Sequence, residues 1–174
     1  MIYLLFAFCI LAAEFSIKRR IEAMDEAAFP IRLAGGFVLE KHHNYGFMLN
    51  RLDRHPKLVR ISCLLVFLPL LAWSLRMFFK KESASSGDFF GKLGAACLAG
   101  GAASNLYDRF SRGYVVDYLR LPNRAGARPA CCFGSKLPHA GLRIKKIRNV
   151  IFNIADFFIF LGGAFTAVYG FFTK

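Results

Sequence analysis

The chain has 174 residues, of which 56% are hydrophobic and 20 are phenylalanine, and its formal net charge is +13. This length allows one domain, and so apolar a composition excludes an ordinary soluble fold. In a soluble protein the positive charge would suggest nucleic acid, but here the cations flank apolar segments, where they can meet anionic lipid headgroups. We therefore expect a membrane protein whose partners are membrane lipids and not nucleic acid.

Four apolar segments approach the length of a membrane-spanning helix, which needs about 20 residues to cross the hydrocarbon core. They are residues 2–17, 58–79, 89–107 and 150–172. The first could also be a cleavable signal peptide, but apolar residues follow Met1 directly and no positive n-region precedes them. The sequence predicts an all-α integral membrane protein, a single domain over residues 1–174 with four transmembrane helices and a small extracytoplasmic β-type loop region.

Near the end of the first segment, Glu14 and Lys18 stand four residues apart, a spacing that places both side chains on one face of a helix. From spacing alone, this is an ion pair at a helix end.

The loop over residues 19–57 is more charged than the segment before it, and it contains glycines and β-favouring residues. We expect a short strand or hairpin on the membrane surface, with Asn44 and Gly46 inside it, where glycine permits a tight turn.

In the third segment, alanine, glycine and serine recur at helical spacing along one broad face. A face of small residues lets membrane helices approach closely. Gly94, Leu98, Gly101 and Asn105 fall on one stripe of this helix. The stripe directs Asn105 toward the interior of a helix bundle and away from lipid.

Two aspartates accompany the last two apolar segments. Asp117 follows the third segment in a stretch that also holds Asp108, and Asp156 opens the fourth segment three residues after Asn153. An ionisable residue at a membrane segment is costly and indicates function. A transporter in which Asp156 and Glu14 carry a proton or an ion is one alternative, but it predicts carboxylates near the middle of the membrane and not at helix ends.

Other chemistries find less support. His42 and His43 have no second cluster at ligand spacing, and the five cysteines form no C-x-x-C pair, so we expect no metal and no cofactor. Ser104 is the one candidate serine nucleophile, but no membrane segment presents a histidine as its base.

Residues 119–149 are rich in cations and are typical of a surface loop or an amphipathic patch.

Five short motifs, taken in chain order, resemble those of the lipoprotein signal peptidases, the bacterial membrane aspartyl proteases that remove signal peptides from prolipoproteins. They are residues 14–18 (E-F-S-I-K) for D-x-x-x-K, 44–47 (N-Y-G-F) for N-x-G-x-[AF], 104–109 (S-N-L-Y-D-R) for G-N-x-x-D-R, 113–118 (G-Y-V-V-D-Y) for G-x-V-x-D-[FY], and 152–156 (F-N-I-A-D) for F-N-x-A-D. Glu14 and Ser104 depart from the family's Asp and Gly. The segment before Asn153 is longer than the family's usual link.

The resemblance implies that Asp117 and Asp156 are a catalytic pair that shares one proton and activates water on a peptide bond. It implies a structural role for Asp108 and a prolipoprotein substrate with a diacylglycerol on the cysteine after the cut. The residues implied to support the pair or the substrate are Glu14, Lys18, Asn44, Gly46, Asn105, Arg109, Asn153 and Ala155. We expect the protein to be a monomer. The alternative to a peptidase is a degenerate relative of the family that only binds lipopeptides.

The resemblance also implies an orientation in the bacterial cytoplasmic membrane. It places both termini in the cytoplasm and the loops 19–57 and 108–149 outside, with the active site near the extracytoplasmic face. Charge counts point the other way, since residues 18–57 hold eight Lys and Arg residues and residues 108–149 hold ten, against four around the link between the second and third segments. We adopt the family orientation, because charge counts lose weight as loops lengthen.

Overall fold

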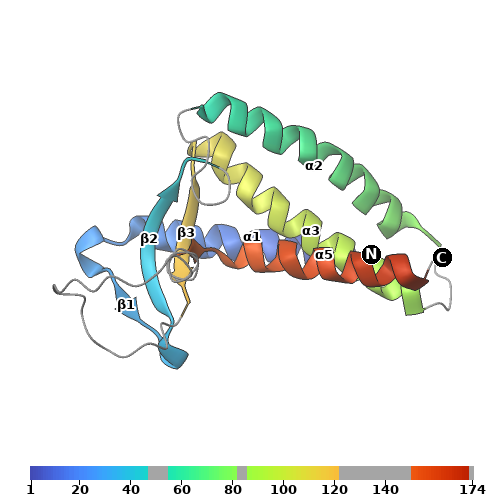
Figure 1. Ribbon diagram of the computed structural model, residues 1–174, viewed down its shortest axis with the longest axis horizontal. Coiled ribbons are helices and arrows are strands. Elements are labelled where there is room, and N and C mark those ends of the chain that lie inside the picture. Colours follow the sequence, from blue (N-terminus) through green and yellow to red (C-terminus); the bar gives the residue numbers. More distant parts are fainter. Residues whose placement is uncertain (47–54, 82–85, 122–149, 173–174) are drawn as a thin grey trace, which may run out of the picture.

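The computed structural model describes residues 1–46, 55–81, 86–121 and 150–172, and it shows long helices running together with a small sheet at one end (Figure 1). The helices are α1 (Ile2–Ala23), α2 (Pro56–Phe79), α3 (Ser86–Ser111) and α5 (Ile154–Phe172), with short 3-10 turns at Glu26–Ala28 and Ala34–Gly36. The strands are β1 (Ile31–Arg32), β2 (Val38–Asn44), β3 (Val115–Arg120) and β4 (Ile151–Phe152). Residues 122–149 of the predicted basic segment lie outside the described residues.

Helix α3 is the centre of the bundle and packs against α1, α2 and α5. A Cβ atom added to Gly101 would lie 2.7 Å from the carbonyl oxygen of Ala155 in α5, and one added to Gly100 would lie 2.7 Å from that of Ala7 in α1. Only a residue without a side chain allows backbones to come this close. The small residues of the predicted third segment therefore bring α3 into direct contact with helices on two sides.

Two helices within the described residues, α2 and α5, are long and apolar enough to cross a membrane. Their large apolar side chains are widely exposed, as Leu65 and Phe160 show with 64% and 78% of their surfaces accessible. Exposed apolar surface on this scale fits contact with lipid and not with water. Helices α1 and α3 contain more charged residues, so their crossing of the membrane stays a prediction.

The helix ends differ from those expected from apolarity alone. Helix α1 continues to Ala23 and does not end at residue 17, because Glu14 and Lys18 are buried in the bundle and do not terminate the helix. Helix α5 begins at Ile154 and not at residue 150, because Asn153 caps it: the Asn153 Oδ1 accepts a hydrogen bond of 3.0 Å from the backbone N–H of Asp156.

The sheet is antiparallel throughout, with the strand order β1-β2-β3-β4. The hairpin expected between residues 19 and 57 is present as β1 and β2. The stretch expected to be a surface loop from residue 108 instead continues α3 to Ser111 and then forms β3. The first four residues of β3 are all buried, so this strand lacks the alternation of polar and apolar residues that would have indicated it in the sequence. Because β3 lies between β2 and β4 in the sheet, Asp117 is on an inner strand.

Candidate active site

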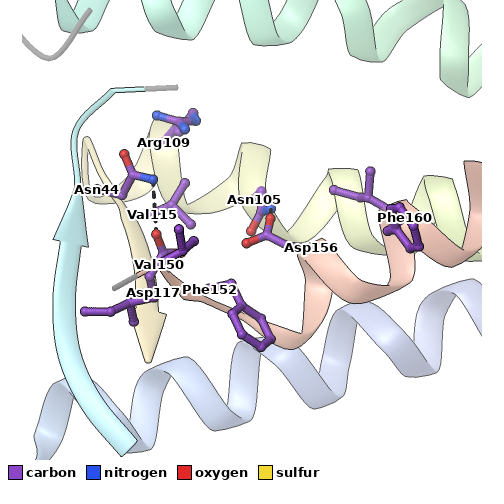
Figure 2. A pocket seen from close by; sticks show the side chains of 11 residues that line it. Asn44, Asn105, Arg109, Val115, Asp117, Val150, Phe152, Asp156 and Phe160 are labelled. Carbon is purple, nitrogen blue, oxygen red and sulfur yellow. Dashed lines mark hydrogen bonds between the residues drawn. The ribbon is translucent and has the colours of Figure 1, made fainter. Parts of the chain in front are cut away.

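Polar side chains from separate elements meet around a cavity of about 460 Å³ at the sheet end of the bundle (Figure 2). The residues that line it are Asn44, Asn105, Arg109, Val115, Asp117, Val150, Ile151, Phe152, Asp156, Ile159 and Phe160. The cavity thus brings together the two aspartates that the sequence singled out, one from β3 and one from the first turn of α5.

Asp117 is held by two asparagine amides. Its side chain is only 4% exposed, and its Oδ2 and Oδ1 accept hydrogen bonds from the Nδ2 of Asn44 (3.1 Å) and of Asn153 (2.8 Å). Burial, followed by the nearby charge of Asp156, raises the pKa of Asp117 from 3.8 to about 6. This carboxyl group can therefore hold or release a proton close to neutral pH.

Asp156 is fixed by the start of its own helix and by α3. Its Oδ2 accepts from the backbone N–H of Asn153 (3.3 Å), while the Asp156 N–H donates to the Asn153 Oδ1 (3.0 Å). These reciprocal bonds form a capping box, with an aspartate in the place of the usual glutamate. The other carboxylate oxygen accepts from the Nδ2 of Asn105 at 2.8 Å.

Asn153 joins the two carboxyl groups. Its side-chain amide donates to Asp117 and its backbone N–H donates to Asp156. The residue is fully buried, so its position is fixed by the surrounding packing. One rigid residue therefore sets the relative placement of the two aspartates.

Lys18 is the centre of a buried polar cluster behind the cavity. Its Nζ lies 3.0 Å from the Oδ2 of Asp108 and 3.4 Å from the Oε2 of Glu14. It also donates to Ser104 Oγ at 3.1 Å and to Asn105 Oδ1 at 2.9 Å. Ser104, where the family motif has glycine, thus supplies one more acceptor to the buried ammonium group.

The partners of the asparagines dictate which way their amides point. Lys18 can only donate, so Asn105 must turn its oxygen to Lys18 and its NH₂ to Asp156. In the same way, the backbone N–H of Gly46 donates to the Oδ1 of Asn44, which leaves the Asn44 NH₂ for Asp117. Both amides are therefore oriented to donate to a carboxylate.

Asp108 and Arg109 have different partners despite being adjacent. The Asp108 carboxylate pairs with Lys18 and, at 2.6 Å, with Arg112. Arg109 lines the cavity, and its Nη2 donates to the carbonyl oxygen of Gly46 at 2.7 Å. Asp108 is thus neutralised by these two cations and not by its neighbour in the sequence.

The ten predicted site residues fall into layers around the cavity. Five of them line it: Asn44, Asn105, Arg109, Asp117 and Asp156. Four support these through the contacts above: Glu14, Lys18, Gly46 and Asn153. Ala155 is buried against Gly101 of α3, which makes it a packing residue.

Sequence reasoning missed Tyr118 as part of this site. Its hydroxyl donates to the Oε1 of Glu14 at 2.7 Å and accepts from the backbone N–H of Ile154 at 3.3 Å. Tyr118 fills the last position of the motif at residues 113–118, but that position accepts Phe or Tyr, so the motif gives no signal of the contacts of the hydroxyl, whose two partners come from distant parts of the chain. Burial of the phenol raises the pKa of Tyr118, so it remains a hydrogen-bond donor at neutral pH.

A second, mostly apolar groove of about 410 Å³ adjoins the first cavity between α2, α3 and α5. Asn105, Arg109 and Ile159 border both spaces. The rest of its lining is Cys63, Val66, Phe67, Leu70, Leu98, Ala102 and Leu106. The site therefore pairs a polar cavity with an apolar groove.

Within the described residues, no group of three or more His, Cys, Asp or Glu side chains could hold a metal ion.

Comparison with known proteins identifies the family. The family model for signal peptidase (SPase) II matches residues 6–172. The chain belongs to the signal peptidase II family. The match contains both aspartates of the site and the three asparagines whose side chains donate to them.

Two lipoprotein signal peptidases that this chain resembles share less than a third of its residues in the aligned regions. A lipoprotein signal peptidase of Allorhizobium ampelinum is 29% identical over 119 residues, which cover 67% of this chain and 68% of that protein. One of Sinorhizobium fredii is 29% identical over 115 residues, 66% of each chain. The alignments thus span about two thirds of these relatives.

Solved structures share the fold. A bacterial membrane enzyme determined by the in meso method at 2.3 Å resolution matches with a TM-score of 0.66 at 20% identity, over 95% of this chain and 85% of that one. A second, at 1.9 Å resolution, matches with a TM-score of 0.64 at 18% identity, over 95% and 90%. The bundle and its sheet are therefore an architecture already seen in bacterial membrane enzymes.

Proposed function

We propose that this signal peptidase II family member is a membrane aspartyl endopeptidase that removes the signal peptide from diacylglyceryl-modified prolipoproteins. The observation that carries the proposal is the pairing of Asp117 and Asp156 at one cavity, with Asn153 donating a hydrogen bond to each. Membership of the family and the lipoprotein signal peptidase relatives supply the substrate class.

The chemistry we propose uses the two carboxyl groups as one unit. One carboxylate removes a proton from water as the oxygen attacks the scissile carbonyl carbon, and the protonated partner donates to the carbonyl oxygen. As the tetrahedral intermediate collapses, the C–N bond breaks, the carboxyl group that took the proton from water passes it to the leaving amine, and the other carboxylate takes back the proton from the intermediate's hydroxyl. The pair thus ends with the single proton with which it began. The raised pKa of Asp117, about 6, supports a pair that takes up and releases a proton close to neutral pH.

The apolar groove supports a lipid-modified substrate. It opens beside Asn105 and Arg109, so an acyl chain lying against α2, α3 and α5 would reach the edge of the polar cavity. Arg109 is anchored to the carbonyl oxygen of Gly46 and borders both spaces, where its guanidinium can donate to a substrate backbone. We therefore assign the cavity to the peptide bond and the groove to the lipid.

In the membrane, we propose one domain over residues 1–174 with four spans, α1, α2, α3 and α5, in the bacterial cytoplasmic membrane. The sheet and the aspartates would then lie near the extracytoplasmic face, with both termini in the cytoplasm. A reporter enzyme active only outside the membrane should be inactive when fused at Lys174 and active when fused at Ser135. Activity of the Lys174 fusion would overturn this orientation.

The decisive experiment is cleavage of a synthetic diacylated prolipoprotein peptide by the purified chain in detergent, followed by mass spectrometry. We expect a new N-terminus at the lipid-modified cysteine and loss of cleavage in both Asp117→Asn and Asp156→Asn. Asp25→Asn is the matched control, since Asp25 is exposed and only caps the turn at Glu26–Ala28. Binding of the peptide without cleavage would instead indicate a non-catalytic relative that holds lipopeptides.

A further inference from the structure

The hydroxyl of Tyr118 connects three elements of the site. Tyr118 lies on β3 directly after Asp117 and is only 2% exposed. Its hydroxyl donates to Glu14 of α1 and accepts from the backbone N–H of Ile154 in α5. A single phenol oxygen thus links the strand that bears one aspartate to the helix that bears the other.

The contact with Ile154 is structurally significant because Ile154 is the first residue of α5. The N–H groups of the first turn of a helix have no partner within the helix, and they need one when they are shielded from water. Tyr118 provides it at a position next to Asn153, which contacts both carboxylates. The phenol therefore sets how closely the start of α5 approaches β3.

Glu14 continues the same network toward the other aspartate. Its Oε1 accepts from Tyr118, and its Oε2 lies 3.4 Å from the Nζ of Lys18. Lys18 in turn donates to Asn105, which donates to Asp156. One buried carboxylate thus couples the strand of Asp117 to the amide that holds Asp156.

We propose that Tyr118, together with Glu14, is a positioning residue that fixes the spacing of Asp117 and Asp156. The inference rests on the proposed function, because positioning has meaning only for a catalytic pair. Neither residue lines the cavity. Their loss should therefore lower the rate of the chemical step and leave substrate binding nearly unchanged.

Two substitutions break the contact from opposite sides while preserving charge and bulk. Tyr118→Phe removes only the hydroxyl. Glu14→Asp keeps the negative charge opposite Lys18 but withdraws the carboxylate by one methylene, which opens a bond that is now 2.7 Å long. Tyr114→Phe is the matched control: it removes a hydroxyl just before the same strand, and Tyr114 does not line the cavity.

The test is steady-state cleavage of the diacylated peptide by the wild type, both single variants and the double variant. We expect kcat to fall about tenfold in each single variant, KM to change by less than about twofold, and the double variant to be no slower than the slower single variant. Tyr114→Phe should match the wild type. Circular dichroism and thermal unfolding in the same detergent confirm that each variant is folded.

The outcomes separate this inference from the proposed function. A wild type that cuts the peptide while folded Tyr118→Phe retains full kcat would overturn the positioning role alone. Losses that multiply to about a hundredfold in the double variant would also overturn it, because the two residues would then act independently. A wild type that never cuts the peptide would overturn the proposed function and this inference together.

Discussion

Asp117→Asn should abolish cleavage and at the same time stabilise the folded protein at neutral pH. The amide cannot exchange the proton that the reaction needs, so turnover should fall to background. Stability should rise because the ionised Asp117 is a buried charge beside a second carboxylate, and the amide removes that charge. Such an opposition between activity and stability is expected of a catalytic group and not of a structural one.

The size of the effect follows from the pKa. A folded-state value of about 6 against 3.8 corresponds to a penalty of about 3 kcal/mol on the ionised form. The substitution also loses one hydrogen bond, since an amide oxygen can replace only one of the two acceptor contacts with Asn44 and Asn153. With about 1 kcal/mol for that bond, the net gain at neutral pH is about 2 kcal/mol.

The sign of the pH dependence is also fixed. Because the pKa of Asp117 is raised in the folded state, the folded protein binds the proton more tightly, and stability falls as pH rises from about 4 to about 6. The variant lacks this titration. It should therefore be about as stable as the wild type at pH 4.5 and about 2 kcal/mol more stable at pH 7.5.

Thermal unfolding in detergent, followed by circular dichroism at the two pH values, measures the difference, and the diacylated peptide measures turnover. Asp25→Asn again serves as the control and should show neither effect, because Asp25 is exposed. The reasoning is refuted if Asp117→Asn is less stable than the wild type at pH 7.5, or if it keeps near-normal turnover.

Three other substitutions test the supporting structure. Lys18→Met removes the cation paired with buried Glu14 and one of the two cations paired with Asp108, and it should cost about 3 kcal/mol or more in the free energy of unfolding, with loss of cleavage; unchanged stability would contradict the buried cluster. Gly101→Ala should weaken the contact between α3 and α5 and lower the unfolding temperature, whereas Gly163→Ala, with nothing within 4 Å of its added Cβ, should not. Asn153→Ser keeps an oxygen to cap α5 but loses the amide donor to Asp117, so it should retain helix content by circular dichroism while cleavage falls at least tenfold; equal loss of both would contradict this division.

The sequence predicts which residues meet around the cavity better than it predicts the surrounding backbone. The stripe of Gly94, Leu98, Gly101 and Asn105 predicts an inward-facing amide by helical geometry alone, and Asn105 does donate to Asp156. The strand around Asp117 escapes such reasoning, because its first four residues are all buried and its contacts with α1 and β2 come from distant parts of the chain. Lys18 shows the same limit: its spacing predicts Glu14 as a partner, but Asp108, Ser104 and Asn105 reach it only through the fold.

The choice of hydrogen-bond donors around the aspartates is itself an argument for shared-proton chemistry. The donors that the structure gives to Asp117 are the side-chain amides of Asn44 and Asn153. A neutral amide orients a carboxyl group without neutralising it, whereas a contacting ammonium or guanidinium would strongly favour the ionised form. Lys18 is close enough to lower the pKa of Asp117, but its effect is smaller than those of burial, Asp156 and the two amides, and its ammonium is already paired with Glu14 and Asp108. The buried cation is also linked to Asp156 through the amide of Asn105, which accepts from Lys18 and donates to the carboxylate. Neutral amide donors of this kind leave the proton of the proposed mechanism free to move between the two aspartates.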